Sequence, residues 1–139
     1  MSAWNPELVG ALCDRCILRD IREGDPVPPE VNPGATMLLI GERPGRDETR
    51  HLRPFVGRAG EELQLALVPL GIQRGHVSID NAQACMPLAG QMGLVEARLA
   101  KVNAERTASG LEPMLHPVDA CRPRLLRVVR EHAARGVPN

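Results

Sequence analysis

The sequence predicts an α/β fold with a short parallel sheet, and its central part carries the pattern. Residues 36–40 are an apolar run typical of a strand buried on both faces. After a loop, residues 61–67 have the spacing of an amphipathic helix, which Gly71 closes. Residues 76–80 then indicate a second short strand. The order strand, helix, strand predicts a parallel pair with a right-handed crossover.

The segments around this strand pair are predicted as helices and a connector. Asn5 followed by Pro6 is a helix start signal, so we expect a helix over residues 6–18. Residues 25–34 are rich in proline and are therefore expected to be extended. Residues 94–107 have the spacing of a mostly polar helix. Its narrow apolar stripe comprises Val95, Leu99 and Val102.

The last predicted helix begins at Asp119 and ends near Ala134. It carries a run of arginines, namely Arg122, Arg124, Arg127 and Arg130. A basic helix face contacts phosphate in some proteins, but a solvated surface is the commoner explanation for such a run. We therefore expect these arginines to face solvent.

The composition excludes several classes of protein. With 139 residues the chain is one domain at most. Its formal net charge is zero, so no general basic field attracts nucleic acid. No apolar run reaches membrane-spanning length, and the amino terminus lacks the basic segment of a signal peptide. We expect an intracellular, cytoplasmic protein that does not enter a membrane.

The loop from Gly41 to Gly60 is the first candidate for a site. It leaves the carboxyl end of the first strand, where open α/β sheets bind ligands, and it is longer than a plain connector needs to be. It contains the acid Glu42 and the only phenylalanine of the chain, Phe55. Phe55 either stacks on a ligand or anchors the loop, and Glu42 either does chemistry or caps the loop. Asn81 ends the second strand, so we expect it at the same sheet edge.

The cysteines are the second candidate. They form one CxxC pair and two separate positions, namely Cys13, Cys16, Cys85 and Cys121. Without an export signal, structural disulfides are disfavoured and a metal centre becomes the leading hypothesis. Four thiolates suit a 4Fe-4S cluster, while zinc and ordinary buried thiols remain alternatives. Spacing alone does not separate iron–sulfur from zinc.

Taken together, the motifs resemble the iron–sulfur class, family 4, of uracil-DNA glycosylases. That family shows an amino-terminal CxxC, then GEAPG, PFVGxAG, a strand ending in TN, a Cys-Pro and a further Cys-x-Pro. The corresponding segments here are CDRC, GERPG, PFVGRAG, Asp80-Asn81, Cys85-Met86-Pro87 and Cys121-Arg122-Pro123. The resemblance extends over residues 13–130. It implies a single glycosylase-like domain over residues 1–139, a partial three-layer αβα sandwich, and a 4Fe-4S cluster on the four cysteines.

The resemblance also implies an activity, the hydrolysis of the N-glycosidic bond of uracil in DNA during base excision repair. Such an enzyme extrudes the base into a pocket that grips its edge and faces. By resemblance Phe55 is the stacking face, and Asn81 donates to uracil O4 while it accepts from N3–H. Glu42 resembles the family acid that orients or activates water. The remaining pocket residues implied are Gly41, Arg43 and Asp47.

Three departures from the family pattern stand out. Leu52 replaces the usual glycine before Arg-Pro-Phe. Thirty-five residues separate Cys85 from Cys121, which indicates an inserted helix. The family continues with two further strands and a His-Pro-Ser type motif, the His-x-Ser motif, which this sequence lacks. We interpret His116-Pro117 as a chance match, because Val118 follows it.

The missing motif leaves other functions open. The first alternative is a non-catalytic, Fe–S-stabilised module that binds nucleic acid or protein. The second is a zinc-stabilised interaction domain. The expected partner is DNA containing uracil, with the missing half supplied by a partner chain in an assembled enzyme.

Overall fold

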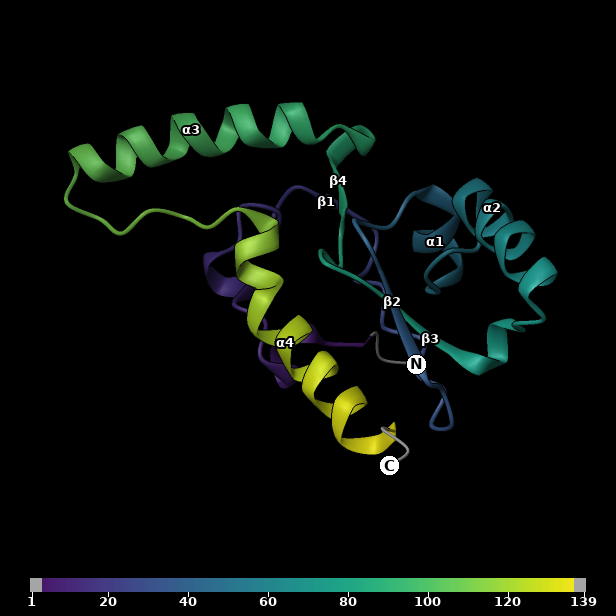
Figure 1. Cartoon of the computed structure of the whole chain (residues 1–139). Helices are drawn as coiled ribbons and strands as arrows, with labels where there is room; N and C mark the ends of the chain where they lie inside the picture. Colours follow the sequence, from purple (N-terminus) through teal and green to yellow (C-terminus); the bar gives the residue numbers. More distant parts are fainter. Residues whose placement is uncertain (1–3, 137–139) are drawn as a thin grey trace.

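The computed structural model describes residues 4–136 and confirms a mixed α/β fold (Figure 1). Strands β2 (Met37–Gly41) and β3 (Val77–Asn81) pair in parallel, in register from Met37 beside Val77 to Gly41 beside Asn81. The helices α1 (Arg46–His51) and α2 (Arg58–Leu67) lie between these strands in the chain. The predicted parallel pair is therefore confirmed, with each strand one residue later than expected.

The remaining elements surround this pair. A two-residue antiparallel ladder joins β1 (Arg22–Glu23) to β4 (Met86–Pro87). The two long helices, α3 (Met92–Ala108) and α4 (Pro117–Gly136), follow in the carboxyl-terminal half. The short 3-10 helices are η1 (Pro6–Val9), η2 (Cys13–Arg15), η3 (Val68–Leu70), η4 (Arg74–His76) and η5 (Leu88–Gly90).

Strand β3 is the centre of the sheet. All five of its residues are buried. Strand β2 covers one edge, and the proline-rich connector covers the other, because Glu30 exchanges two backbone hydrogen bonds with Ile79 at 2.8 and 2.9 Å. Apart from this bridge, residues 25–34 have no regular secondary structure, and residues 33 and 34 form a turn.

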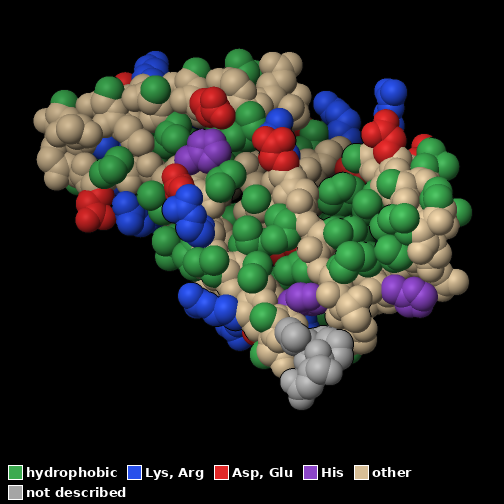
Figure 2. All heavy atoms as spheres, viewed as in Figure 1, with side chains coloured by type: hydrophobic (Ala, Val, Ile, Leu, Met, Phe, Trp, Pro, Cys, Tyr) green, Lys and Arg blue, Asp and Glu red, His purple; other side chains and the backbone are tan. Residues whose placement is uncertain are grey.

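Strand β2 does not match its prediction of burial on both faces. Met37 keeps 37% and Ile40 48% of its surface exposed. Figure 2 shows hydrophobic side chains gathered over this part of the sheet and over α2. The prediction was wrong because apolar character alone does not say whether other elements cover a strand. Met37 and Ile40 lie on opposite faces of β2, so within residues 4–136 each face keeps one solvent-exposed side chain.

The predicted helix over residues 6–18 is also wrong. Asn5 does cap a helix, since its Oδ1 accepts from the Glu7 amide at 2.9 Å, but the helix is the one-turn η1. Gly10 ends it with a φ of 106°, a left-handed conformation that glycine adopts without strain. The Leu12 amide then donates to the Ala120 carbonyl of α4 at 2.9 Å. Tertiary pairing with α4 therefore replaces a continuous helix around the CxxC.

The other helices lie close to their predicted positions. The segment expected as a loop contains α1, and α2 begins at Arg58, three residues earlier than expected. Gly71 closes the following 3-10 turn with a φ of 69°, as predicted. Both long helices begin two residues earlier than expected.

The hydrophobic core joins α3 and α4 to the amino-terminal segment. Its buried members are Cys16, Ile17, Leu18, Met92, Val95 and Ala120. Leu99 and Val102 pack against this cluster, which confirms the predicted apolar stripe of α3. Figure 1 shows the rest of α3 extending away from the sheet. In the described part of the chain, the helices are too short or too polar for a transmembrane span.

His116 has a local structural role that agrees with a chance match to the His-x-Ser motif. Its Nδ1 accepts from the Val118 amide at 3.1 Å, at the start of α4. Its Nε2 lies 3.6 Å from Glu96 on α3. The imidazole thus joins the ends of two helices.

Candidate functional site

The parallel register brings Phe55 and Asn81 together at Gly41. Gly41 is the last residue of β2 and lies beside Asn81, the last residue of β3. A Cβ placed on Gly41 would lie 2.5 Å from Cε2 and Cζ of the Phe55 ring and 2.6 Å from Oδ1 of Asn81. The ring and the carboxamide therefore share one corner, which we call the Gly41 corner, and only a glycine fits between them.

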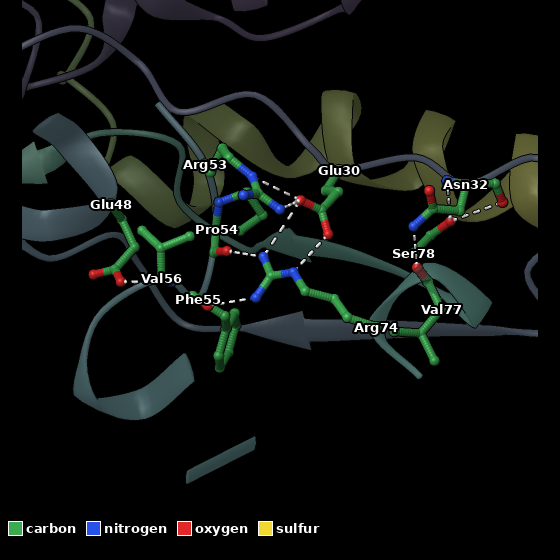
Figure 3. A network of polar contacts seen from close by, with 10 residues as sticks. All are labelled: Glu30, Asn32, Glu48, Arg53, Pro54, Phe55, Val56, Arg74, Val77 and Ser78. Atoms are coloured by element: carbon green, nitrogen blue, oxygen red, sulfur yellow. Dashed lines mark hydrogen bonds and ion pairs between the residues drawn. The ribbon is translucent and has the colours of Figure 1, made fainter. Parts of the chain in front are cut away.

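The backbone that presents Phe55 is held in an unusual conformation. Phe55 has a φ of 52°, which is uncommon for a residue with a side chain. Arg74 of η4 donates to the Phe55 carbonyl at 2.5 Å and also to the Pro54 carbonyl (Figure 3). A Cβ on Gly60 would lie only 1.9 Å from the Phe55 carbonyl oxygen, so the start of α2 packs directly under this turn.

Glu30 anchors the arginines around this turn. Its carboxylate pairs with Arg74 at 2.8 Å and with Arg53 at 2.5 Å (Figure 3). Burial acts to raise the pKa of Glu30, but the hydrogen bonds and positive charges of Arg74 and Arg53 outweigh it, so the pKa lies below its ordinary value. The proline-rich connector thereby fixes the Phe55 turn from one side.

Glu48 fixes the same loop from its other side. One carboxylate oxygen accepts from the Gly45 amide at 3.0 Å, and the other accepts from the amides of Val56 at 2.9 Å and Gly57 at 2.5 Å. One side chain thus satisfies amides at the starts of both α1 and α2. We did not predict this role, although a Glu three residues after Gly45 matches the spacing of a capping box.

Glu42 lies beside the Gly41 corner but faces a different hollow. Its side chain is 77% exposed and accepts from Arg43 Nη1 at 2.6 Å. Glu42 and Arg43 line a depression of about 260 Å³ against β4, whereas Phe55 and Arg74 line another of about 290 Å³. The structure therefore brings Gly41, Phe55 and Asn81 together and places Glu42 one residue away on the neighbouring hollow.

Asp47 lies apart from both hollows. It is exposed on α1, and its Oδ2 would be 3.0 Å from a Cβ placed on Gly57. Its carboxylate therefore packs beside the start of α2. Among the predicted pocket residues, Asp47 is the one that the structure does not bring to the Gly41 corner or to the Glu42 hollow.

The four cysteines line one cavity of about 380 Å³. They reach it from η2, from the segment after β3 and from α4. Arg19 and Arg22 border the same cavity. The structure thus brings all four predicted metal ligands together, although residues distant in the sequence contribute them.

The electrostatics of the cavity disfavour free thiolates. Burial, reinforced by the negative charge of neighbouring thiolates, raises the pKa of Cys16 to about 11 and that of Cys85 to about 12. The pKa of Cys13 is raised for the same reasons. Arg22 opposes the shift at both Cys13 and Cys85. A positively charged centre between these sulfurs would remove the penalty for ionising them.

The arrangement also bears on the kind of metal centre. Over residues 4–136, no group of three Cys, His, Asp or Glu side chains is placed to hold a metal ion. The four sulfurs instead line a cavity of about 380 Å³. Four cysteine sulfurs are a donor set that suits both a 4Fe-4S cluster and zinc.

A buried ion pair behind Asn81 was not predicted. Arg124 of α4 and Asp80 of β3 are 0% and 1% exposed, and Arg124 Nη1 donates to Asp80 Oδ2 at 2.7 Å. Burial raises the pKa of Asp80, while Arg124 opposes the shift. The prediction that the arginines of this helix face solvent is therefore wrong for Arg124. The helical spacing of Cys121, Arg124 and Val128, all buried, was the signal that could have found it.

Comparison with known proteins identifies a family and several relatives. The family model of the uracil DNA glycosylase superfamily matches residues 28–137. A type-4 uracil-DNA glycosylase of Pyrobaculum aerophilum is 43% identical over 75 residues, which cover 54% of this chain and 38% of that protein.

Two further type-4 uracil-DNA glycosylases show similar likeness. That of Sulfurisphaera tokodaii is 41% identical over 76 residues, covering 54% of this chain and 34% of that protein. That of Archaeoglobus fulgidus is 39% identical over 75 residues, which cover 54% of this chain and 37% of that protein. The matched region therefore spans well under half the length of these relatives.

Proposed function

This chain belongs to the uracil DNA glycosylase superfamily, and we propose that it recognises uracil in DNA and hydrolyses its N-glycosidic bond. The observation that carries the proposal is the Gly41 corner, where an aromatic ring and a carboxamide both lie against Gly41 at the ends of β2 and β3. The similarity to type-4 uracil-DNA glycosylases supports the choice of base and reaction.

The two side chains at the corner suit the two surfaces of an extruded uracil. The Phe55 ring offers a face for stacking, a contact worth about 1–3 kcal/mol per base. The Asn81 carboxamide has a donor for uracil O4 and an acceptor for N3–H, whereas cytosine presents the opposite pair of groups. No described residue hydrogen-bonds this carboxamide, although Asn81 is only 4% exposed.

Glu42 is the proposed acid–base residue. Its carboxylate would accept a proton from a water that attacks C1′ of the sugar, and the C1′–N1 bond would break with its electron pair leaving on uracil. The negative carboxylate would also stabilise the cationic sugar that develops as that bond breaks. Its exposure on the hollow next to the Gly41 corner leaves room for such a water.

We also propose that the four cysteines hold a 4Fe-4S cluster. Bound there, the cluster would supply cross-links between the amino-terminal segment, the segment after β3 and α4 rather than a step of the hydrolysis. Arg19 and Arg22, which border the cavity, would offset the negative charge that four thiolates bring.

Release of uracil from a single-stranded oligonucleotide tests the proposed reaction. We expect wild-type protein, purified without oxygen, to release the base, and Glu42→Ala to lose this activity. Glu62→Ala is the matched control, because Glu62 is an exposed acid on α2. Wild-type protein that releases no uracil, or activity that Glu42→Ala leaves intact, would contradict the proposal.

A second candidate function is favoured by the state of Glu42. Its carboxylate already accepts from Arg43 Nη1 at 2.6 Å, so one of its oxygens is engaged before a water binds. A non-catalytic module would bind nucleic acid and release no base. Salt-dependent binding of the oligonucleotide by a wild-type protein that leaves uracil in place would favour this module.

The cluster has a separate test. We expect anaerobically purified protein to contain iron and sulfide and to absorb near about 400 nm, as clusters of this type do. Colourless protein with stoichiometric zinc would favour the zinc-stabilised domain instead.

A further inference from the structure

We propose that Arg124 is a positioning residue that sets Asn81 for base recognition and thereby determines specificity for uracil. The inference rests on the proposed function, because it concerns how the Gly41 corner distinguishes bases. Arg124 lies on α4 behind the sheet and does not reach the hollows beside Phe55 or Glu42. Its effect on recognition must therefore act through Asn81.

Hydrogen bonds from two buried side chains hold the backbone of Asn81. Arg124 Nη2 donates to the Asn81 carbonyl at 2.6 Å, while Asp80 Oδ1 accepts from the Asn81 amide at 2.7 Å. Arg124 Nη1 donates to the second oxygen of Asp80 at 2.7 Å. The pair of Arg124 and Asp80 therefore holds both polar groups of the Asn81 main chain.

The Asn81 side chain depends on its backbone for orientation, and that backbone is held both by its place in the β2–β3 ladder and by the pair of Arg124 and Asp80. The Asn81 carboxamide has no hydrogen-bond partner among the described residues, although Asn81 is only 4% exposed. An unanchored carboxamide that rotates by half a turn exchanges its donor and acceptor, and would then match cytosine as well as uracil. The packing of Asn81 Oδ1 against Gly41 restricts that rotation only while the backbone stays in place.

Arg124 is buried in a way that only specific contacts can compensate. The residue is fully buried, its Cζ lies 5.7 Å from the centre of the Trp4 ring, and its Nε has no partner in the described part of the chain. Burying a guanidinium costs desolvation free energy unless well-placed ion pairs and hydrogen bonds compensate for it. A forked contact to both Asp80 and the Asn81 carbonyl is a geometry that lysine cannot reproduce.

The test compares binding of two single-stranded oligonucleotides that differ in one base. One carries 2′-fluoro-2′-deoxyuridine and the other 2′-fluoro-2′-deoxycytidine, because the electron-withdrawing fluorine protects both glycosidic bonds during a titration. Fluorescence anisotropy gives the affinity ratio of the two probes. Asn81→Ala gives the affinity ratio of the two probes in the absence of the carboxamide.

Arg124→Lys is expected to lower the preference for the uracil probe by about tenfold, the low end for one bidentate base contact. In the Asn81→Ala background, the same substitution should leave the ratio unchanged, because Arg124 acts through Asn81. The matched control is Arg127→Lys on the same helix, where Arg127 is exposed and pairs with Glu131. This control should keep the wild-type ratio.

Should Arg124→Lys fail to fold, the neutral pair Asp80→Asn with Arg124→Gln replaces it and should lower the preference in the same way. If either Arg124 variant kept the wild-type preference for the uracil probe, the inference would be overturned while the proposed function would stand. The same holds if the Arg124 substitution changed the affinity ratio equally in the wild-type and Asn81→Ala backgrounds. Equal binding of both probes by wild-type protein would instead overturn the proposed function and the inference with it.

Discussion

The Gly41 corner and the cysteine cavity are held in opposite ways. At the corner, charged side chains from several segments hold the backbone in place: Glu48 and Arg74 act on the Phe55 loop, and Arg124 acts on Asn81. In the cavity, buried thiols with raised pKa values face one another around a hollow. Protein groups alone hold the corner, whereas burial keeps the thiols of the cavity in their neutral form.

This difference suggests that the cysteine cavity contributes mainly to stability and the Gly41 corner mainly to base specificity. Four cysteines from three segments line the cavity, so a metal centre bound there would add cross-links to the core that already joins these segments. Protein side chains already hold the corner, so substitutions there should act on recognition and cost less stability. The following variants test this contrast in order of expected effect.

Cys121→Ser should give the largest effect, because it removes one ligand of the proposed cluster from α4. Apparent binding energies of structural metals are on the order of 10 kcal/mol, so we expect loss of iron and loss of cooperative unfolding. Metal analysis and circular dichroism measure both. The control Ala120→Ser adds a hydroxyl at the preceding buried position. A Cys121→Ser protein as stable as this control would contradict the role of the cavity.

Arg124→Met should follow, because it leaves Asp80 as an unpaired buried carboxylate. Breaking a buried pair in this way costs about 3–5 kcal/mol of unfolding free energy. Arg127→Met removes an exposed pair with Glu131 and should cost about 0.5 kcal/mol or less. Urea denaturation of the two variants gives the comparison. Equal losses would show that Arg124 is not specially placed.

Gly41→Ala should disturb the corner, because the new methyl would lie 2.5 Å from the Phe55 ring. Overpacking of this kind costs about 1–3 kcal/mol, and we also expect weaker binding of uracil-containing DNA. Gly75→Ala is the control, since a Cβ at Gly75 meets nothing within 4 Å. If both variants bind like wild-type protein, Phe55 and Asn81 do not form the recognition surface.

Glu30→Gln tests the clamp on the Phe55 turn through its pH dependence. Because the folded pKa of Glu30 is below its ordinary value of 4.5, its contribution to stability is present above that value and is lost as the pH falls through the folded pKa. At pH 7 the variant should be less stable by about 1–3 kcal/mol, the range for hydrogen bonds to charged groups. At acidic pH the difference should shrink. Thermal melts at both pH values measure it, and a constant difference would be contrary to expectation.

Leu52→Gly should have the smallest effect, and a stabilising one. Leu52 ends α1 with a φ of 52°, a left-handed conformation that disfavours side chains and suits glycine. Relief of this strain should add about 0.5–1 kcal/mol after the entropy that glycine brings to the unfolded state. Urea denaturation checks this gain. Destabilisation would show that the partly exposed leucine packs more than its surroundings suggest.

The sequence predicted the order of elements well because local signals dominate there. The apolar run of β2, the stripe of α3 and Gly71 are read from spacing alone, and motif order identified the corner and the four cysteines. Long-range pairing was out of reach. Leu12 bonds to α4 in place of a continuous helix, and Arg124 is buried because β3 supplies Asp80. Burial of a charged residue depends on a partner distant in the chain, which periodicity does not name.

The most direct test of the central claim is base release from two matched single-stranded oligonucleotides, one with uracil and one with cytosine at the same position. Wild-type protein should release uracil and leave cytosine in place, and Asn81→Ala should lose this preference. Release of both bases at equal rates, or a preference that survives in Asn81→Ala, would show that the Gly41 corner does not read the base.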